Sequence, residues 1–193
     1  MYLESQLTNP IMKNNASRRV FLRNTLFATS GVALLSSPLH AFSNSTCPFE
    51  GYNPFAEQKT DLRSSGFFGQ HVIVQGTVYD SVGNQPLTNA SIEIWHLSPN
   101  SNKFRHRGKM LTNNLGEYKF LTDYPNKEIG KNARIYFKIS GATDSYFTEL
   151  VLNQSGAYVS SDHWSRNNQL GKEMFPKKET FLNQTSIQFN LSI

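Results

Sequence analysis

The chain has 193 residues, of which 38% are hydrophobic and 12% aromatic, and it contains one cysteine. This length suits one domain with additional segments, and the single cysteine excludes a disulfide framework and any site built from several thiolates. No run reaches the roughly 18 apolar residues of a membrane-spanning helix, so we expect no membrane span. The net charge of +5 would suit a nucleic-acid-binding protein only if the positive residues lie in the folded domain.

The first 41 residues have the composition of an export signal. The basic sequence S-R-R-V-F-L-R (17–23) precedes a modestly apolar stretch (25–35), and a small residue, Ala41, follows. This order describes a cleavable secretory signal, and the paired arginines resemble a bacterial twin-arginine signal. We expect cleavage after Ala41, with Met12 as an alternative start of translation. The sequence therefore predicts a bacterial protein that is exported to the periplasm or outside the cell.

Removal of residues 1–41 changes the charge argument. These residues hold four of the Lys and Arg residues and one of the acidic residues, so the net charge of the remainder is +2. The remaining positive residues are scattered, apart from a short cluster at 103–109 that we interpret as a solvated hairpin face. Because no nucleic-acid-binding motif accompanies this cluster, we expect no nucleic-acid partner.

Short strands separated by turns are predicted after the export signal. Alternation of apolar and polar residues predicts strands at 71–79, 90–96, 134–140, 147–152 and 186–193, a weaker strand at 103–111 and a short one at 117–121. Turn-forming sequences such as D-S-V-G-N (80–84) separate them. No segment has long helical periodicity. About seven strands of this kind predict an all-β fold, an antiparallel β-sandwich.

The segments outside the strands divide the chain further. Residues 42–65 contain prolines and few β-branched residues, so we expect an extended N-terminal arm. The sandwich domain is expected to span 66–193, with an irregular excursion at 153–180 that is rich in polar and aromatic residues. The predicted organisation is therefore an export signal at 1–41, an arm and one β domain.

Four sequence runs resemble the intradiol ring-cleavage dioxygenases, the catechol and protocatechuate type of enzyme. The first is G-T-V-Y-D-S-V-G-N-Q-P-L-T-N-A-S-I-E-I-W (76–95), a pattern that transthyretin-like and carboxypeptidase-regulatory-like sandwiches share in part. The others, in the order and spacing of the dioxygenases, are K-F-R-H-R-G (103–108), T-N-N-L-G-E-Y-K-F-L-T (112–122) and A-R-I-Y-F-K-I (133–139). The resemblance covers 66–150 and implies an intradiol dioxygenase/transthyretin-like β-sandwich.

The resemblance also implies a ferric site, held in the family by two tyrosines and two histidines. The catecholate chelates this iron, and dioxygen inserts between the two hydroxyl-bearing carbons. The matching positions hold Phe104, Glu128, Arg134 and Tyr136. A phenyl ring has no ligand atom, and an always-charged guanidinium cannot donate a lone pair to a metal. We therefore expect a divergent member that lacks the family's iron ligands and holds no metal cofactor.

Four further residues are weaker candidates for the same pocket. Lys131 matches a family arginine, and Tyr124 would stand in for the second tyrosine if the alignment shifts in the short loop. His96 and His106 would form a ferrous or zinc site if they converged with Glu128. The sequence favours the alternative that both histidines are ordinary surface or pocket-rim residues, because it shows no tight ligand spacing.

Other catalytic motifs are absent from the sequence, which has no G-x-S-x-G, no H-E-x-x-H and no glycine-rich phosphate loop. The run S-S-D-H-W (160–164) holds Ser, Asp and His together. Neighbouring residues of one extended segment rarely form a triad, because a triad is assembled by geometry across the fold.

Three functions stay open. The first is an exported pseudoenzyme that has lost the ferric site and binds a small aromatic or anionic ligand, or a partner, through the former pocket. The second is an active ring-cleavage dioxygenase of catechol-type aromatics with a rearranged metal site. The third is a structural or adhesive sandwich domain that uses 42–65 and 153–180 as contact surfaces. The sequence implies no particular oligomeric state.

Overall fold

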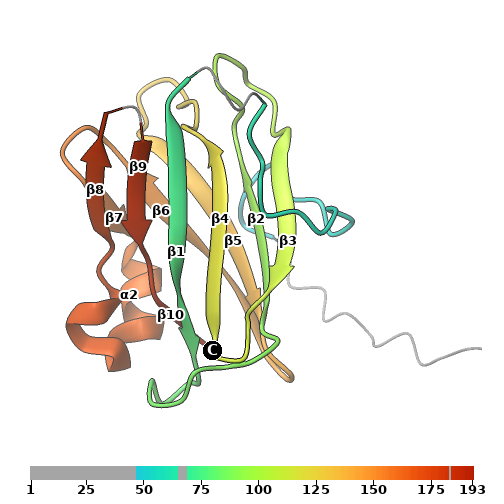
Figure 1. Ribbon diagram of the computed structural model, residues 1–193, viewed down its shortest axis with the longest axis vertical. Helices are drawn as coiled ribbons and strands as arrows, with labels where there is room; N and C mark the ends of the chain where they lie inside the picture. Colours follow the sequence, from blue (N-terminus) through green and yellow to red (C-terminus); the bar gives the residue numbers. More distant parts are fainter. Residues whose placement is uncertain (1–46, 65–68, 183) are drawn as a thin grey trace, which may run out of the picture. The chain divides into compact units, whose positions relative to one another are not determined.

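The computed structural model describes residues 47–64, 69–182 and 184–193. The expected export signal therefore lies outside the described residues. Within them the chain forms ten strands, one α-helix and one 3-10 helix, and the strands make two five-stranded sheets that face each other (Figure 1). The predicted all-β sandwich is confirmed.

The first sheet is built around β1 (His71–Tyr79), a strand in which buried and half-buried residues alternate. β1 pairs antiparallel with β4 (Glu117–Asp123) and parallel with β9 (Gln184–Gln188) and β10 (Leu191–Ser192). β8 (Lys177–Phe181) forms an antiparallel hairpin with β9 at the edge. The pairing of β1 with the C-terminal segment is thus a parallel exception in the antiparallel arrangement that we predicted.

The second sheet has the order β3-β2-β5-β6-β7, and all its pairs are antiparallel. Its strands are β3 (His106–Leu111), β2 (Ser91–His96), β5 (Ala133–Ser140), β6 (Ser145–Leu152) and β7 (Ala157–Val159). Isoleucines, valines and phenylalanines from both sheets meet between them, among them Val74, Ile94, Ile135, Phe137 and Ile187. Burial of apolar surface in such a core supplies most of the favourable free energy of folding.

The strand count exceeds the predicted number for two reasons. The segment 153–180, expected to be irregular, contains β7, α2 (Ser161–Asn167), the 3-10 helix η1 (Asn168–Met174) and most of β8. Ser160 caps α2 by accepting a hydrogen bond from the backbone N–H of His163, and seven residues are too few for a helical period to be visible. The expected strand 186–193 is divided into β9 and β10.

A glycine allows the C-terminal segment to lie along β1. A Cβ atom at Gly76 would lie 1.9 Å from the carbonyl oxygen of Phe189, one of the two residues between β9 and β10. Asn190 then bonds the backbone at this point, because its Oδ1 accepts from the N–H of Thr77 at 3.0 Å. A glycine inside a strand often marks such a close backbone approach.

Residues 47–64, which we call the arm, pack in part on the outer face of the second sheet. Apolar side chains of this face and of the arm, most of them aromatic, form a second cluster, the outer-face cluster: Trp95, Leu97, Phe104 and Tyr136, with Cys47, Phe49, Tyr52 and Phe147. The indole N–H of Trp95 donates to the carbonyl of Glu50 at 2.9 Å. The backbone of the arm also bonds to Lys109 in β3 and to Leu121 in β4, so the arm is attached to both sheets.

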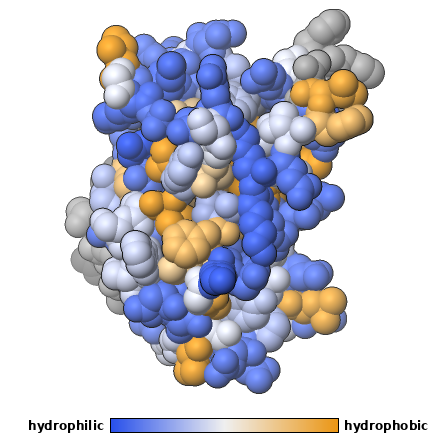
Figure 2. All heavy atoms as spheres, turned by 90° about the vertical axis from the view of Figure 1, so that its left-hand side faces the viewer, coloured by the Kyte–Doolittle hydropathy of each residue, from blue (hydrophilic) through white to orange (hydrophobic). Residues whose placement is uncertain are grey.

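The side of the molecule that carries β8 and α2 is largely hydrophilic, with scattered hydrophobic side chains (Figure 2). Trp164 and Phe175 are exposed there and pack edge to face, with ring centroids 6.1 Å apart. None of the helices in the described part of the chain has the length and apolar character that crossing a bilayer requires.

Candidate functional site

The four positions that match the family's iron ligands lie on or near the outer face of the second sheet. Arg134 and Tyr136 alternate on β5 with the core residues Ile135 and Phe137, so their side chains leave the opposite face. Phe104 precedes β3 and belongs to the outer-face cluster. The fourth position, Glu128, lies in the loop between β4 and β5.

Tyr136 is held in an aromatic stack. Its ring stacks on Phe49 of the arm at a centroid distance of 4.8 Å and on Trp95 of β2 at 5.7 Å, with Phe104 at 6.2 Å. Burial raises the pKa of the Tyr136 phenol to about 12, so this group is neutral at physiological pH. A tyrosinate that binds a metal would have to lose this proton.

The charged residues at the matched positions pair with neighbours of opposite charge. Arg134 Nη1 donates to Glu149 Oε2 on β6 at 2.7 Å, and the Glu149 side chain is largely buried. Glu128 forms an ion pair with Lys131, the residue that matches a family arginine. Both carboxylates therefore already neutralise a cation of this chain.

Three of the four positions surround one hollow, but it is very small. Glu128, Arg134 and Tyr136 line it, and its volume is about 10 Å³. A volume of this size holds about one water molecule. Phe104 does not line this hollow and contacts Tyr136 within the outer-face cluster instead. The fold thus brings three of the four positions to one hollow, and a hollow of this volume is too small for an aromatic ring.

The two candidate histidines lie on the other side of the same sheet. His96 pairs in register with His106, their rings stack at 4.8 Å, and they share the face of Ile94 rather than that of Trp95 and Tyr136. His96 is fully buried between Thr122 Oγ1 and the carbonyl of Leu97, and burial lowers its pKa to about 3. The alternative in which both histidines converge with Glu128 and Tyr136 is therefore not formed, because successive residues of a strand point to opposite faces and the histidines lie on the face away from Tyr136. Within the described ranges, no three His, Cys, Asp or Glu residues are arranged to hold a metal ion.

A buried polar network that the sequence analysis missed surrounds His106. Its Nε2 lies 3.0 Å from Asp123 Oδ2, and the other carboxylate oxygen lies 3.2 Å from His71 Nδ1. The backbone N–H of Ser64 also donates to Oδ2, at 2.8 Å. Burial opposes ionisation, but the hydrogen bonds from Ser64 and His106 outweigh it and lower the pKa of Asp123. One signal in the sequence could have indicated Asp123. It is an acidic residue at the end of β4, where it pairs with His71, the first residue of β1.

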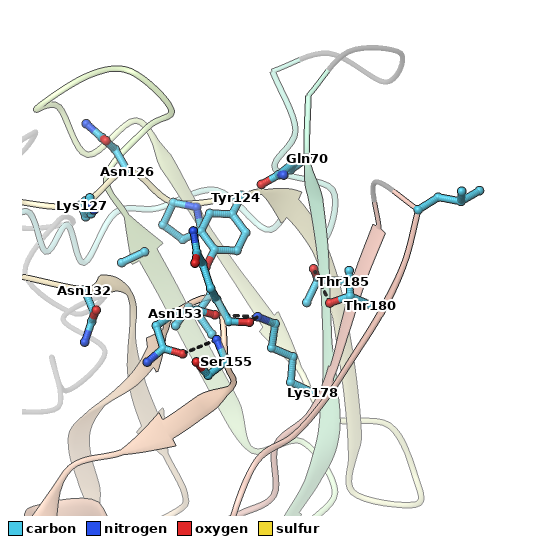
Figure 3. Close-up of a pocket in the computed structure, with 15 residues that line it drawn as sticks. Gln70, Tyr124, Asn126, Lys127, Asn132, Asn153, Ser155, Lys178, Thr180 and Thr185 are labelled. Carbon is cyan, nitrogen blue, oxygen red and sulfur yellow. Dashed lines mark hydrogen bonds between the residues drawn. The ribbon is translucent and has the colours of Figure 1, made fainter.

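A large cavity lies at one end of the sandwich, where β1, β5 and β9 begin and β4 and β6 end. Its volume is about 890 Å³, within the size range of small-molecule sites. Tyr124, the weaker tyrosine candidate, projects its ring into this cleft, with Gln70, Thr180 and Thr185 across from it (Figure 3). We call it the Tyr124 cleft.

The wall of the Tyr124 cleft is polar and carries positive charge. Amide and hydroxyl side chains dominate, namely Gln70, Asn126, Asn132, Asn153, Gln154, Ser155, Thr180 and Thr185. Two lysines, Lys127 and Lys178, line it, and none of its described lining residues is acidic. The ammonium group of Lys178 donates to the backbone carbonyl of Asn153 at 2.6 Å, which fixes it in the wall of the cleft (Figure 3).

A second cavity of about 620 Å³ adjoins this cleft. The two share Gln70 and the segment 124–126, and the second cavity is further lined by Ser98, Arg105, His106 and Asp123. The polar network around His106 therefore forms part of its wall. Both cavities lie at the same end of the sandwich.

Comparison with known proteins gives matches at the level of structure only. No protein-family model matches the sequence, and no curated protein sequence matches it. The dioxygenase domain of a dioxygenase–carbohydrate-binding protein fusion from Streptomyces sp. SirexAA-E superimposes with a TM-score of 0.57 and 18% identity, over 75% of this chain and 94% of that one. An intradiol ring-cleavage dioxygenase from Tetranychus urticae gives a TM-score of 0.55 and 14% identity, over 74% and 89%.

A third solved structure has the same architecture. The 3-chlorocatechol 1,2-dioxygenase from Rhodococcus opacus 1CP gives a TM-score of 0.53 and 16% identity, over 73% of this chain and 68% of that one. At these identities the similarity establishes the fold, which agrees with the order of the sequence runs at 76–95, 103–108, 112–122 and 133–139. The chain therefore has the fold of the intradiol ring-cleavage dioxygenases.

Proposed function

We propose that this protein is an exported, intradiol-dioxygenase-like binding protein that does not hold iron in the family's manner. The observation that carries the proposal is the hollow of about 10 Å³ between Glu128, Arg134 and Tyr136. A chelated catechol and a ferric ion need far more room than one water molecule. The protein would thus have kept the sandwich and lost the ring-cleavage site.

The donor chemistry at the matched positions supports this proposal. A ferric ion prefers anionic oxygen and imidazole ligands. Phe104 supplies neither, and the guanidinium of Arg134 is a fixed cation that pairs with Glu149. Tyr136 keeps its proton because burial raises its pKa to about 12. The residues present therefore do not fit the ferric ion of the family.

The Tyr124 cleft is the better place for a ligand than the former pocket. It combines an aromatic ring with amide groups, hydroxyl groups and two lysines, and its volume is about 890 Å³. An aromatic carboxylate would stack on Tyr124 and place its negative charge near Lys127 or Lys178. We infer that the ligand is a small aromatic or anionic molecule.

Metal analysis of the purified protein tests the loss of the ferric site. The expected preparation is colourless, contains far less than one iron per chain after growth in iron-rich medium, and does not cleave catechol. Tyrosinate-bound ferric iron absorbs visible light, so a coloured protein with one iron per chain would contradict the proposal. That result would support the alternative of a rearranged dioxygenase site.

Titration calorimetry with benzoate and with benzyl alcohol tests the ligand class. We expect benzoate to bind and the neutral analogue to bind more weakly. Lys127→Gln should weaken benzoate binding by about threefold, since exposed charge pairs contribute little, whereas Lys172→Gln, outside the cleft, should leave it unchanged. Equal affinity for both compounds, or equal effects of both substitutions, would count against an anionic ligand.

Export is the remaining part of the proposal and rests on S-R-R-V-F-L-R (17–23). Replacement of both Arg18 and Arg19 by Lys should retain the protein in the bacterial cytoplasm, whereas the wild-type chain should be recovered outside it. Recovery of both proteins in the cytoplasm would refute the export signal.

A further inference from the structure

Three side chains outside the proposed ligand cleft form a continuous relay in the wall of the adjoining cavity. Ser98 Oγ lies 2.8 Å from His106 Nδ1, and His106 Nε2 lies 3.0 Å from Asp123 Oδ2. The three residues are 5–6% exposed and come from three places in the chain: the loop after β2, the start of β3 and the end of β4. In this order the hydroxyl can act as the nucleophile, the imidazole as its general base and the carboxylate as the group that orients the base.

The hydrogen bonds determine which imidazole nitrogen is the base. The carboxylate of Asp123 is an acceptor only, so His106 Nε2 must carry the proton that lies between them. In a neutral ring, Nδ1 is then unprotonated and accepts a hydrogen bond from the Ser98 hydroxyl. The Ser98 oxygen itself accepts from the backbone N–H of Arg105 at 3.2 Å, so its own hydrogen is available for His106.

The same argument separates Ser98 from the other nearby serine. Ser64 Oγ lies 3.1 Å from His106 Nε2, the nitrogen that carries the proton. Ser64 can therefore receive a hydrogen bond from the ring but cannot transfer its proton to it. Ser98 is the hydroxyl that faces the basic nitrogen.

The surroundings hold the relay in one geometry. Asp123 accepts hydrogen bonds from His106 and from the Ser64 backbone, which favour its ionised form, and His71 lies 3.2 Å from its other oxygen. The ring of His106 stacks at 4.8 Å on that of His96, which is itself fixed by hydrogen bonds to Thr122 and Leu97. An ionised, buried carboxylate that fixes the imidazole tautomer has the role of the acid in a Ser-His-Asp triad.

We propose that this relay makes Ser98 a nucleophile toward carboxylic esters bound in the cavity of about 620 Å³. Ser98 Oγ forms a bond with the ester carbonyl carbon while its proton moves to His106 Nδ1. The carbon–oxygen bond to the alcohol breaks, and the alcohol leaves with that proton. Water then attacks the acyl-serine, gives a proton to Nδ1 and releases the carboxylic acid, after which the proton returns to Ser98 Oγ.

Other groups on the cavity wall suit an ester carbonyl. Arg105 and Asn100 line the same space and carry hydrogen-bond donors that would stabilise the oxyanion formed during attack. Asp123 acts through His106 and is a positioning residue, whereas Ser98 and His106 touch the reacting atoms.

Covalent labelling of the purified full-length protein tests this proposal. The wild-type chain is incubated with a fluorophosphonate, which reacts with activated serines, and the product is analysed by intact mass and peptide mapping. We expect one adduct per chain, located on Ser98, and slow hydrolysis of p-nitrophenyl acetate. Ser98→Ala should lose both signals, and Ser98→Cys should react with a thiol-directed reagent instead.

Matched variants separate catalysis from a structural role. Ser165→Ala changes an exposed serine of α2, away from the cavity, and should label like wild type. Asp123→Asn should slow labelling by about 10²-fold and shift its pH profile to lower pH, since the imidazolium loses its counter-charge. Absence of an adduct on the folded wild-type protein, or an adduct on Ser64, would overturn the proposal. Neither result depends on iron content or on benzoate binding, so this proposal can fail independently of the proposed function.

Discussion

At the residue scale, Tyr136 shows how a position that matches a metal ligand can take a structural role. Its ring lies between Phe49 and Trp95, so the side chain fills the outer-face cluster instead of an open site. Arg134, two residues earlier on the same face, is anchored by Glu149. Tyr136 thus stabilises the contact between the second sheet and the arm, and Arg134 links β5 to β6 within that sheet.

Tyr136→Ala should therefore destabilise the protein by about 3–5 kcal/mol, the usual cost of removing a buried aromatic ring. Tyr136→Phe keeps the stack and should cost less than about 1 kcal/mol. Urea unfolding of both variants measures the difference. A similar loss of stability in both would mean that the hydroxyl group, rather than the packed ring, is what this position contributes.

At the element scale, the C-terminal segment is joined to β1 by a parallel pairing that depends on one small residue. Gly76 meets the carbonyl oxygen of Phe189 at a distance that leaves no room for a side chain. The strands β9 and β10 lie on the two sides of this point. The completed sheet thus depends on an approach of two backbones.

Gly76→Ala should force these backbones apart and destabilise the protein by roughly 1–3 kcal/mol. Gly141→Ala is the matched control, because a Cβ there would meet only Ile193 side-chain atoms at 3.6 Å or more. Thermal unfolding of the two variants makes the comparison. Equal melting temperatures would show that the first sheet adapts to a methyl group at this crossing.

At the scale of the whole molecule, buried histidines make stability depend on pH. Burial lowers the pKa of His96 to about 3 and that of His163 to about 4, from an unfolded value of about 6.5. The unfolded chain therefore binds protons that the folded chain excludes. Above pH 6.5 both histidines are neutral in the folded and the unfolded chain, and the free energy of unfolding is at its full value. It decreases as the pH falls from 6.5 toward the pKa values of the folded state.

Between pH 7 and pH 5, each of the two histidines should reduce the free energy of unfolding by about 2 kcal/mol. His163→Gln should reduce this pH-dependent decrease in the free energy of unfolding by the contribution of one histidine, because glutamine does not titrate. Urea unfolding at both pH values, for wild type and variant, gives the difference directly. A variant with the full wild-type pH dependence would show that His163 does not exclude a proton in the folded state.

The sequence predicted the central strands well because their periodicity is local. The strand 71–79 and the neighbouring predicted strands appear with closely similar bounds, and turn residues such as those at 80–84 separate them. It did not predict α2 or β7, because seven and three residues are too short to show a period. The parallel pairing of β1 with β9 was also missed, since a pairing partner distant in the chain leaves no local pattern.

The candidate site was predicted only in part. The resemblance implied one pocket for Phe104, Glu128, Arg134 and Tyr136, and the last three of these residues line one small hollow. The polar network around Asp123 was missed, because its members come from four separate segments of the chain.

The sequence by itself determined the all-β class, the resemblance to intradiol dioxygenases and the chemistry at the four matched positions, all of which depend on residue type and local spacing. Only the tertiary structure decided that the hollow between the matched positions is small, that the Tyr124 cleft is open and that Ser98, His106 and Asp123 meet. The physical reason is that a cavity and a hydrogen-bonded relay arise where separate strands end side by side. Their distances are fixed by the packing of the two sheets and not by the order of residues along the chain.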